Sequence, residues 1–385
     1  MLGFSTYAAL LPELRDAWGL SNSQAGIVGG MFFAGYAATV SLWTALTDRT
    51  DPRNVYLAGS VLAALGSAGF GLFAEGFLTS SLFQALLGVG IAATYMPGLR
   101  LLSDRISGPY QSRYISFYTS FFGIGIALSL AIAGYAAPAW GWRAAFFVCA
   151  LGPAIAGAWV FFAIGRTRRS SPHAFSLATL FPLAAWRRVL ADRACAGFTL
   201  GYTVHCLELF GSRAWIVAFL AFSAGHFGNA FPWNLAAIAA VVNFASVPAS
   251  IVGNEIAVRI GRRRWIMIAM LASGSCGLAL GVGAGWHWGL VLALLLAHSL
   301  FIMADSGTLT AGLVAAAPAE LRGAALGLYS LLGFGGGMLG PIVFGAALDA
   351  AGGAQRHLAW IAAYAAIGAG CLAAPLVVRI FRPPT

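Results

Sequence analysis

Residues 143–165 read RAAFFVCALGPAIAGAWVFFAIG, a run of 23 residues whose one charge is Arg143 at its start. A helix needs about 20 consecutive apolar residues to cross the hydrocarbon core of a bilayer, so this run predicts a transmembrane helix. The whole chain has the same character: of its 385 residues, 60% are hydrophobic and 9% are charged. A soluble domain carries about 25% charged residues. The composition therefore excludes a soluble globular protein, a disordered or collagen-like chain and a disulfide scaffold, and leaves a polytopic membrane protein.

Similar runs recur along the chain and predict an all-α fold with twelve transmembrane helices, the first of them short. The expected spans are 1–14, 23–46, 54–74, 77–103, 113–137, 143–165, 195–221, 234–258, 264–285, 288–316, 322–348 and 357–380. The longest connection contains RTRRSSPH and AAWRRVLADR, which is typical of a polar linker with an amphipathic surface helix. We therefore expect an N-terminal six-helix bundle (1–165), a cytoplasmic linker (166–194) and a C-terminal six-helix bundle (195–385).

The arginines predict the orientation of these spans. All 22 basic residues are arginine, and basic residues accumulate on cytoplasmic loops. If both termini are cytoplasmic, 17 arginines face inward, three (Arg15, Arg143 and Arg356) face outward, and Arg100 and Arg213 lie in or near spans. This split explains the net charge of +10 without a nucleic-acid partner.

An internal repeat supports two pseudo-symmetric halves. Arg49 and Arg53 recur as Arg259 and Arg263 at an offset of 210 residues, and the glycines at 123 and 125 recur at 333 and 335 with the same offset. The seventh span begins near Cys195, so its counterpart would begin before residue 1. Either the start of the chain is truncated or misplaced, which we expect, or the first helix is unusual.

Two arginine-rich loops and two helix entries together resemble the major facilitator superfamily over essentially the whole chain. TALTDRTDPRNV (44–55) is similar to the family's loop motif G-x-L-x-D-R-x-G-R-[RK] at Asp48 and Arg49, and departs from it at Thr44, Asp51 and Pro52. GNEIAVRIGRRRW (253–265) resembles the same motif in the second half, with Val258 in place of the acid. APAWGWRAAFFV (137–148) and PAELRGAALGLYSLLGFGGGMLGP (318–341) resemble entries to the sixth and eleventh helices.

The resemblance implies a secondary transporter whose loop residues clamp its cytoplasmic ends. Asp48 would accept from the amides at the start of the eleventh helix, and Arg49 would pair with Asp104. The implied gating residues are Asp48, Arg49, Arg53, Asp104, Arg259 and Arg263. The alternative is that these charges only set the topology. Gln84 in place of a common arginine, and the absence of the G-x-x-x-G-P-x-x-G-G signature from GIGIALSLAIAG (123–134), weaken a drug/proton antiporter assignment.

Two carboxylates lie near the middle of predicted spans. An ionisable group at the bilayer centre costs at least ~2.5 kcal/mol, so Glu208 and Asp305 are candidate functional residues. At 100° per residue, His205 and Glu208 share a polar stripe, and His298 lies two helical turns before Asp305. Because the seventh and tenth helices face one cavity in the family, the four side chains could converge and exchange protons. The structural alternative is a set of neutral interhelical hydrogen bonds.

Other polar residues on the expected cavity-lining helices complete the candidate site. Arg213 could pair across helices, hold an anionic solute or extend toward the interface. Aromatic walls with a few polar groups suit a small organic solute. The remaining candidates are Tyr36, Tyr118, Asn243 and Tyr329. The five cysteines form no CxxC pair, so no metal site or cofactor is expected.

The leading hypothesis is a monomeric, proton-coupled transporter that moves a small organic solute by rocker-switch alternating access. It would lie in a bacterial inner membrane with both termini in the cytoplasm. The alternatives are a drug or metabolite exporter, and a transporter-like membrane sensor or assembly factor. An integral membrane enzyme is not expected, because no nucleophile, metal cluster or phosphate loop is apparent in the sequence.

Overall fold

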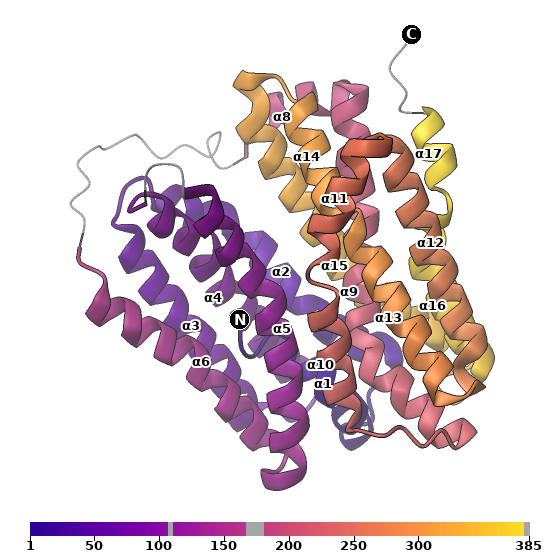
Figure 1. The fold of residues 1–385 in the computed structure, drawn as a ribbon. Helices are drawn as coiled ribbons and strands as arrows, with labels where there is room; N and C mark the ends of the chain where they lie inside the picture. Colours follow the sequence, from indigo (N-terminus) through magenta and orange to yellow (C-terminus); the bar gives the residue numbers. More distant parts are fainter. Residues whose placement is uncertain (107–110, 167–180, 381–385) are drawn as a thin grey trace. The chain divides into compact units, whose positions relative to one another are not determined.

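The computed structural model describes residues 1–106, 111–166 and 181–380, and this part of the chain is helical throughout, without strands (Figure 1). Its helices form two compact units, one of Met1–Leu10 and Met31–Phe181, the other of Leu11–Gly30 and Pro182–Thr385. Residues 11–30 thus pack with the C-terminal helices. The expected division into 1–165, 166–194 and 195–385 stays a prediction.

In the described part of the N-terminal half, a short first helix is followed by five long ones. They are α1 (Thr6–Ala17), α2 (Asn22–Leu46), α3 (Pro52–Phe73), α4 (Phe77–Ser103), α5 (Gln111–Trp140) and α6 (Trp142–Ala163). The departures from the family's loop motif have a local cause, since Asp51 caps α3 by accepting from the Arg53 amide, and Pro52 takes the first helical position.

The described part of the C-terminal half begins with a short amphipathic helix, continues with longer ones and ends with a helix of seven residues. They are α8 (Leu183–Ala191), α9 (Arg193–Phe227), α10 (Leu235–Ala245), α11 (Ala249–Ile260), α12 (Arg262–Val282), α13 (Trp288–Ala304), α14 (Ser306–Ala316), α15 (Arg322–Ala350), α16 (His357–Leu372) and α17 (Ala374–Ile380). The segment expected to be the linker contains the amphipathic helix α8, and its role as a surface helix stays a prediction.

Eleven helical stretches of the described chain are long and apolar enough to cross a membrane. The first helix, α1, has 12 residues and is not one of them. These findings confirm the prediction of eleven clear spans and a short first helix.

Three of the described spans are interrupted, and the last of them changes from α16 to α17 at Ala373. The eighth changes from α10 to α11 before Pro248, which cannot donate a helical hydrogen bond. The tenth changes from α13 to α14 at Asp305, without a proline. There the Trp265 indole of α12 donates to the Ala304 carbonyl at 2.9 Å, and Gly253 of α11 packs against the same carbonyl. A side chain that bonds a helix carbonyl is a known cause of such a break.

Glycines let neighbouring helices approach closely in the first unit. A Cβ atom on Gly88 of α4 would overlap the carbonyl of Phe32, and one on Gly35 of α2 would overlap that of Ala85. Membrane helices use small residues for such contacts, because dispersion and not the hydrophobic effect holds them together.

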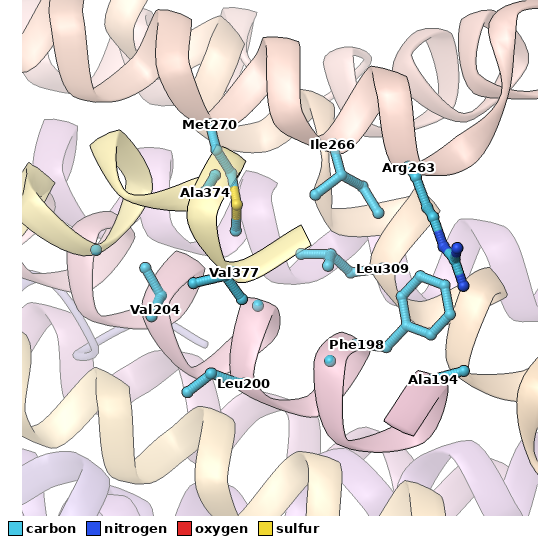
Figure 2. Close-up of a pocket in the computed structure, with 13 residues that line it drawn as sticks. Ala194, Phe198, Leu200, Val204, Arg263, Ile266, Met270, Leu309, Ala374 and Val377 are labelled. Atoms are coloured by element: carbon cyan, nitrogen blue, oxygen red, sulfur yellow. The ribbon is translucent and has the colours of Figure 1, made fainter. Parts of the chain in front are cut away.

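An apolar pocket opens in the second unit between α9, α12, α14, α16 and α17 (Figure 2). Its lining includes Phe198, Met270 and Leu309, and Arg263 is its one charged side chain. The pocket lies among the first turns of α9 and α12, at the end of this unit where α8 and α17 also lie (Figure 1). We call this the arginine end, because Arg262, Arg263 and Arg264 begin α12 there.

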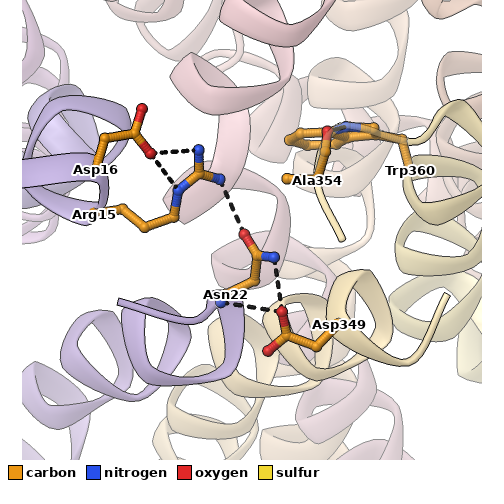
Figure 3. A network of polar contacts seen from close by, with 6 residues as sticks. All are labelled: Arg15, Asp16, Asn22, Asp349, Ala354 and Trp360. Carbon is orange, nitrogen blue, oxygen red and sulfur yellow. Dashed lines mark hydrogen bonds and ion pairs between the residues drawn. The ribbon is translucent and has the colours of Figure 1, made fainter. Parts of the chain in front are cut away.

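At the opposite end of the second unit, Asp349 of α15 caps the start of α2 (Figure 3). Its Oδ1 accepts from the Asn22 amide and side chain at 3.2 and 2.7 Å, and its Oδ2 accepts from the Ser23 amide and hydroxyl at 2.7 and 2.6 Å. Ser21 and Gln24 satisfy each other's amides as a capping box. The first amides of α2 are therefore satisfied partly by a residue more than 300 positions away in the sequence.

Replacing Gly88 by Ala should destabilise the protein, because the new methyl group meets backbone and cannot be avoided by a side-chain rotation. We expect a loss of about 1–3 kcal/mol, measured as a lower unfolding temperature in detergent. Gly327→Ala in α15 is the control, since nothing lies within 4 Å of its added methyl group. Equal losses in the two variants would contradict this account of helix packing.

Replacing Asp349 by Asn should weaken the cap of α2, because a carboxylate accepts on both oxygens whereas an amide accepts on one. The expected loss is about 1–2 kcal/mol, typical of an N-cap, measured by thermal unfolding. Asp16→Asn is the control, because the Asp16 side chain is 69% exposed and bonds its neighbour Arg15. Unchanged stability of the Asp349 variant would show that the cap contributes nothing.

Candidate functional site

The candidate site is built around α9, the longest helix of the described chain. Asp192 begins the helix by accepting from the Cys195 amide at 2.8 Å, and Gly228 ends it in the left-handed conformation with φ of 70°. Near its middle, His205 and Glu208 point to different neighbours. This single helix therefore carries one member of each of two buried acid–histidine pairs.

The first pair joins Glu208 to α12 and α13. Glu208 Oε1 lies 3.4 Å from His298 Nε2, and its Oε2 accepts from the Ser273 hydroxyl at 2.7 Å. Ser212 Oγ lies 3.5 Å from His298 Nδ1 on the far side of the ring. Glu208 and His298 are each 1% exposed. Both carboxylate oxygens thus have partners, which a buried charge requires.

The second pair joins His205 to Asp305, where α13 changes to α14. His205 Nδ1 lies 2.7 Å from Asp305 Oδ1, and each residue is 2% exposed. The two atoms are in ion-pair contact, but the N–H direction does not meet the angle of a hydrogen bond. The break in the tenth span places this carboxylate beside α9.

Aromatic rings extend the second pair into a column. The Tyr202 ring stacks on His205 with centroids 5.6 Å apart and on Tyr329 of α15 with centroids 3.9 Å apart. The Tyr329 hydroxyl lies 3.0 Å from Thr310 Oγ1 of α14. Gly333 makes room for Tyr202, since a Cβ there would overlap its ring. The column gives the imidazole a fixed orientation.

Arg213 and Asn243 form a third polar group of the second unit. Arg213 Nη2 donates to Ser246 Oγ at 3.4 Å, and that hydroxyl donates to the Asn243 carbonyl at 2.8 Å. Within the described residues, buried Arg213 Nε and Asn243 Oδ1 have no hydrogen-bond partner. This group therefore retains both a donor and an acceptor.

Tyr36 and Tyr118 lie in the first unit. The Tyr118 hydroxyl donates to the carbonyls of Tyr95 and Thr94 at 2.8 and 3.2 Å. Tyr118 lines a pocket with Tyr56 and Tyr95, whereas Tyr36 is buried at 1% exposure. Tyr118 is thus placed on a pocket wall, and Tyr36 lies in packed surroundings.

The loop acid Asp48 contacts an arginine that the sequence analysis left outside the gating set. Asp48 Oδ1 lies 3.6 Å from Arg100 Nη1, and Arg100 Nε donates to Asp104 Oδ1 at 3.0 Å. Arg100 therefore bridges two of the expected gating acids. The pairing of Arg49 with Asp104 stays a prediction.

The other expected gating arginines lie in varied surroundings. Arg53 is 5% exposed and donates from Nη2 to the Phe161 carbonyl near the end of α6 at 2.6 Å. Arg259 is exposed, and Arg263 lies at the apolar pocket of Figure 2.

The sequence did not predict that Ser273 donates a hydrogen bond to Glu208. Ser273 lies on α12, the ninth span, which carries no charge in its interior and is lipid-facing in the resembled family. In an apolar helix, the sequence does not indicate which neighbouring helix a serine side chain faces. In the described part of the chain, no group of three or more His, Cys, Asp or Glu side chains could hold a metal ion.

The chain is similar in sequence to several proteins that are named as transporters or resistance proteins. The niacin transporter NiaP of Acinetobacter baylyi is 25% identical over 166 residues, which is 43% of this chain and 37% of that protein. The multidrug resistance protein MdtL of Shewanella oneidensis is 29% identical over 117 residues, which is 30% of this chain and 28% of that protein. A probable 4-methylmuconolactone transporter of Cupriavidus pinatubonensis is 27% identical, over 37% of this chain and 34% of that protein. The matched segments thus span well under half of these relatives.

Solved structures share the fold. A bacterial homologue of the human lysosomal transporter Spinster, inward-facing and unoccupied, superposes with a TM-score of 0.74 at 16% identity, covering 98% of this chain and 92% of that one. A mutant of the nucleoside transporter NupG gives 0.78 at 12% identity, covering 99% and 96%. The sequence model of the Major Facilitator Superfamily matches residues 1–246. With more than half of its length matched, this chain belongs to the Major Facilitator Superfamily.

Proposed function

We propose that the chain is a proton-coupled secondary transporter that moves a small organic solute by alternating access. The observation that carries this proposal is the presence of two buried acid–histidine pairs on α9, Glu208 with His298 and His205 with Asp305. It would act as a monomer in a bacterial inner membrane, with both termini in the cytoplasm.

The pairs suit coupling because one proton changes the charge of each pair. A carboxylate beside a neutral imidazole has a charge of −1, and adding one proton to either group makes the pair neutral. An uncompensated charge in the bilayer costs several kcal/mol, so the neutral pair tolerates burial better. Loading a proton would therefore lower the cost of the conformational change that closes the site to water.

The surroundings of His205 favour a flat organic solute. The column of Tyr329, Tyr202 and His205 offers ring faces, and Arg213 with Asn243 offers an unsatisfied donor and acceptor. Concave sites with aromatic walls and a few polar groups are typical of small-molecule binding. Two relatives are named for niacin and 4-methylmuconolactone, which supports small organic solutes. Tyr36 and Tyr118 are the candidates of the first unit.

The ends of the helices supply candidate gates. At the arginine-bearing loop of the first unit, Asp48, Arg100 and Asp104 form one charge network. In the second unit, at the end opposite the arginine end, Asp349 holds the start of α2 against α15. In an alternating-access cycle the start of α2 would have to leave Asp349 when that end opens. Arg49, Arg53, Arg259 and Arg263 remain proposed gating residues.

Export is the second candidate function, because the relative MdtL is named for multidrug resistance. A transporter-like sensor or assembly factor is the third. Exporter and importer differ in the direction of net flux under a proton gradient, whereas a sensor would bind without flux. The transport assay below therefore separates all three.

Neutralising either acid should uncouple transport from protons. In proteoliposomes with an imposed pH gradient, and with niacin and 4-methylmuconolactone as first solutes, wild type should accumulate solute. Glu208→Gln and Asp305→Asn should reduce accumulation to the level of empty liposomes, because an amide cannot take up the coupling proton. Solute exchange at equal pH should persist in both variants.

Glu255→Gln is the matched control, because Glu255 is an exposed carboxylate on α11 of the same unit. It should accumulate solute as wild type does. Wild-type dependence on the pH gradient in both Glu208→Gln and Asp305→Asn would refute the proposed coupling.

A further inference from the structure

The pocket at the arginine end of the second unit is separate from the acid–histidine pairs. It is lined by the first turns of α9 and α12 together with α14, α16 and α17, and its walls are apolar except for Arg263 (Figure 2). Its volume of about 70 Å³ is several times the roughly 10–15 Å³ that one water molecule needs. An apolar space of this kind takes hydrocarbon in preference to water.

The charge at this pocket is uncompensated. Within the described residues, Arg263 makes no ion pair or hydrogen bond, and neither do its neighbours Arg262 and Arg264. Arg100 in the first unit, in contrast, contacts two carboxylates. Arg263 is exposed, and Figure 2 shows its side chain extending beside Phe198 toward Ala194. The pocket thus combines an apolar interior with a free guanidinium at its edge.

The depth of the pocket matches one leaflet. Its lining on α9 runs from Ala194 to Val204, which spans about 15 Å at 1.5 Å per residue. That is about half of a hydrocarbon core of roughly 30 Å. Arg263 is the second residue of α12, at the level where a membrane helix enters the headgroup region.

Exposed apolar side chains flank the pocket. Leu200 lines it and is 40% exposed, and Leu376 on α17 is 62% exposed. On a membrane-spanning unit, such side chains face lipid. A molecule that reaches this pocket therefore comes most directly from the bilayer.

We propose that this pocket binds an acyl chain of an anionic phospholipid, with the lipid phosphate held by Arg263. A guanidinium bonds phosphate oxygens with two parallel N–H groups, and basic pockets between membrane helices are suited to acidic headgroups. The apolar lining takes the upper part of the chain, and the remainder lies along the open side of the pocket. The lipid bridges α9, α12 and α17, so its binding stabilises the arginine end of the second unit.

The test measures lipid binding to the full chain in neutral detergent. Dioleoyl phosphatidylglycerol and dioleoyl phosphatidylcholine, which share acyl chains, are titrated while bound lipid is followed by native mass spectrometry and unfolding temperature. Phosphatidylglycerol should bind more tightly and raise the unfolding temperature further. Arg263→Gln should weaken phosphatidylglycerol binding about five- to tenfold, as for one lost cation at a membrane surface, and should weaken phosphatidylcholine binding less, because the choline cation already compensates the phosphate of that lipid.

Arg259→Gln is the matched control, because Arg259 is another exposed arginine, has no ion pair among the described residues and lies outside the pocket lining. It should bind phosphatidylglycerol as wild type does. A second variant, Ala194→Phe, fills the pocket and should weaken both lipids.

Three results would overturn the proposal. Equal affinity for the two lipids would mean that no anionic headgroup is recognised. Equal losses in Arg259→Gln and Arg263→Gln would indicate general charge attraction, and the same stabilisation by inorganic phosphate alone would indicate a phosphate site without a lipid chain. None of these measurements requires transport, so the outcome is independent of the proposed transport function.

Discussion

The need to compensate buried carboxylates governs the second unit. Glu208 and Asp305 lie in membrane-spanning helices where solvent water does not reach them, and an unpaired charge there costs several kcal/mol. Each acid therefore has a histidine partner on a neighbouring helix, and Glu208 also has the Ser273 hydroxyl. The packing of α9 against α12, α13 and α14 has to preserve these contacts.

In this chain, close contacts between helix backbones occur beside polar side-chain contacts. Gly253 lets α11 reach the Ala304 carbonyl, and the Trp265 indole bonds that carbonyl, so the tenth span breaks just before Asp305. Irregular backbone at membrane depth is tolerated only where protein or a cavity surrounds it. At the start of α2, Asp349 likewise accepts from a backbone amide that has no partner within its own helix. In both places an acidic residue lies where the helical hydrogen-bond pattern is incomplete.

The fold was predictable because its signals are local. Runs such as 143–165 identify spans by length and polarity, and the arginine-rich loops and the repeat of Arg49 and Arg53 as Arg259 and Arg263 indicate two related halves. The candidate acids were predictable for the same reason, since a carboxylate is conspicuous in an apolar run. Ser273 and the role of Arg100 were not, because a neutral residue or a charge near a span end has no local signature of its partner.

The sequence by itself determined the class of protein, the number and approximate limits of its spans, and which charges lie at membrane depth. These properties depend on the polarity and length of continuous segments. Only the tertiary structure decided that Glu208 pairs with His298 and His205 with Asp305, that α13 ends before Asp305, and that Asp349 caps α2. Those pairings depend on the rotation and register of packed helices, which are set by contacts between residues far apart in the chain.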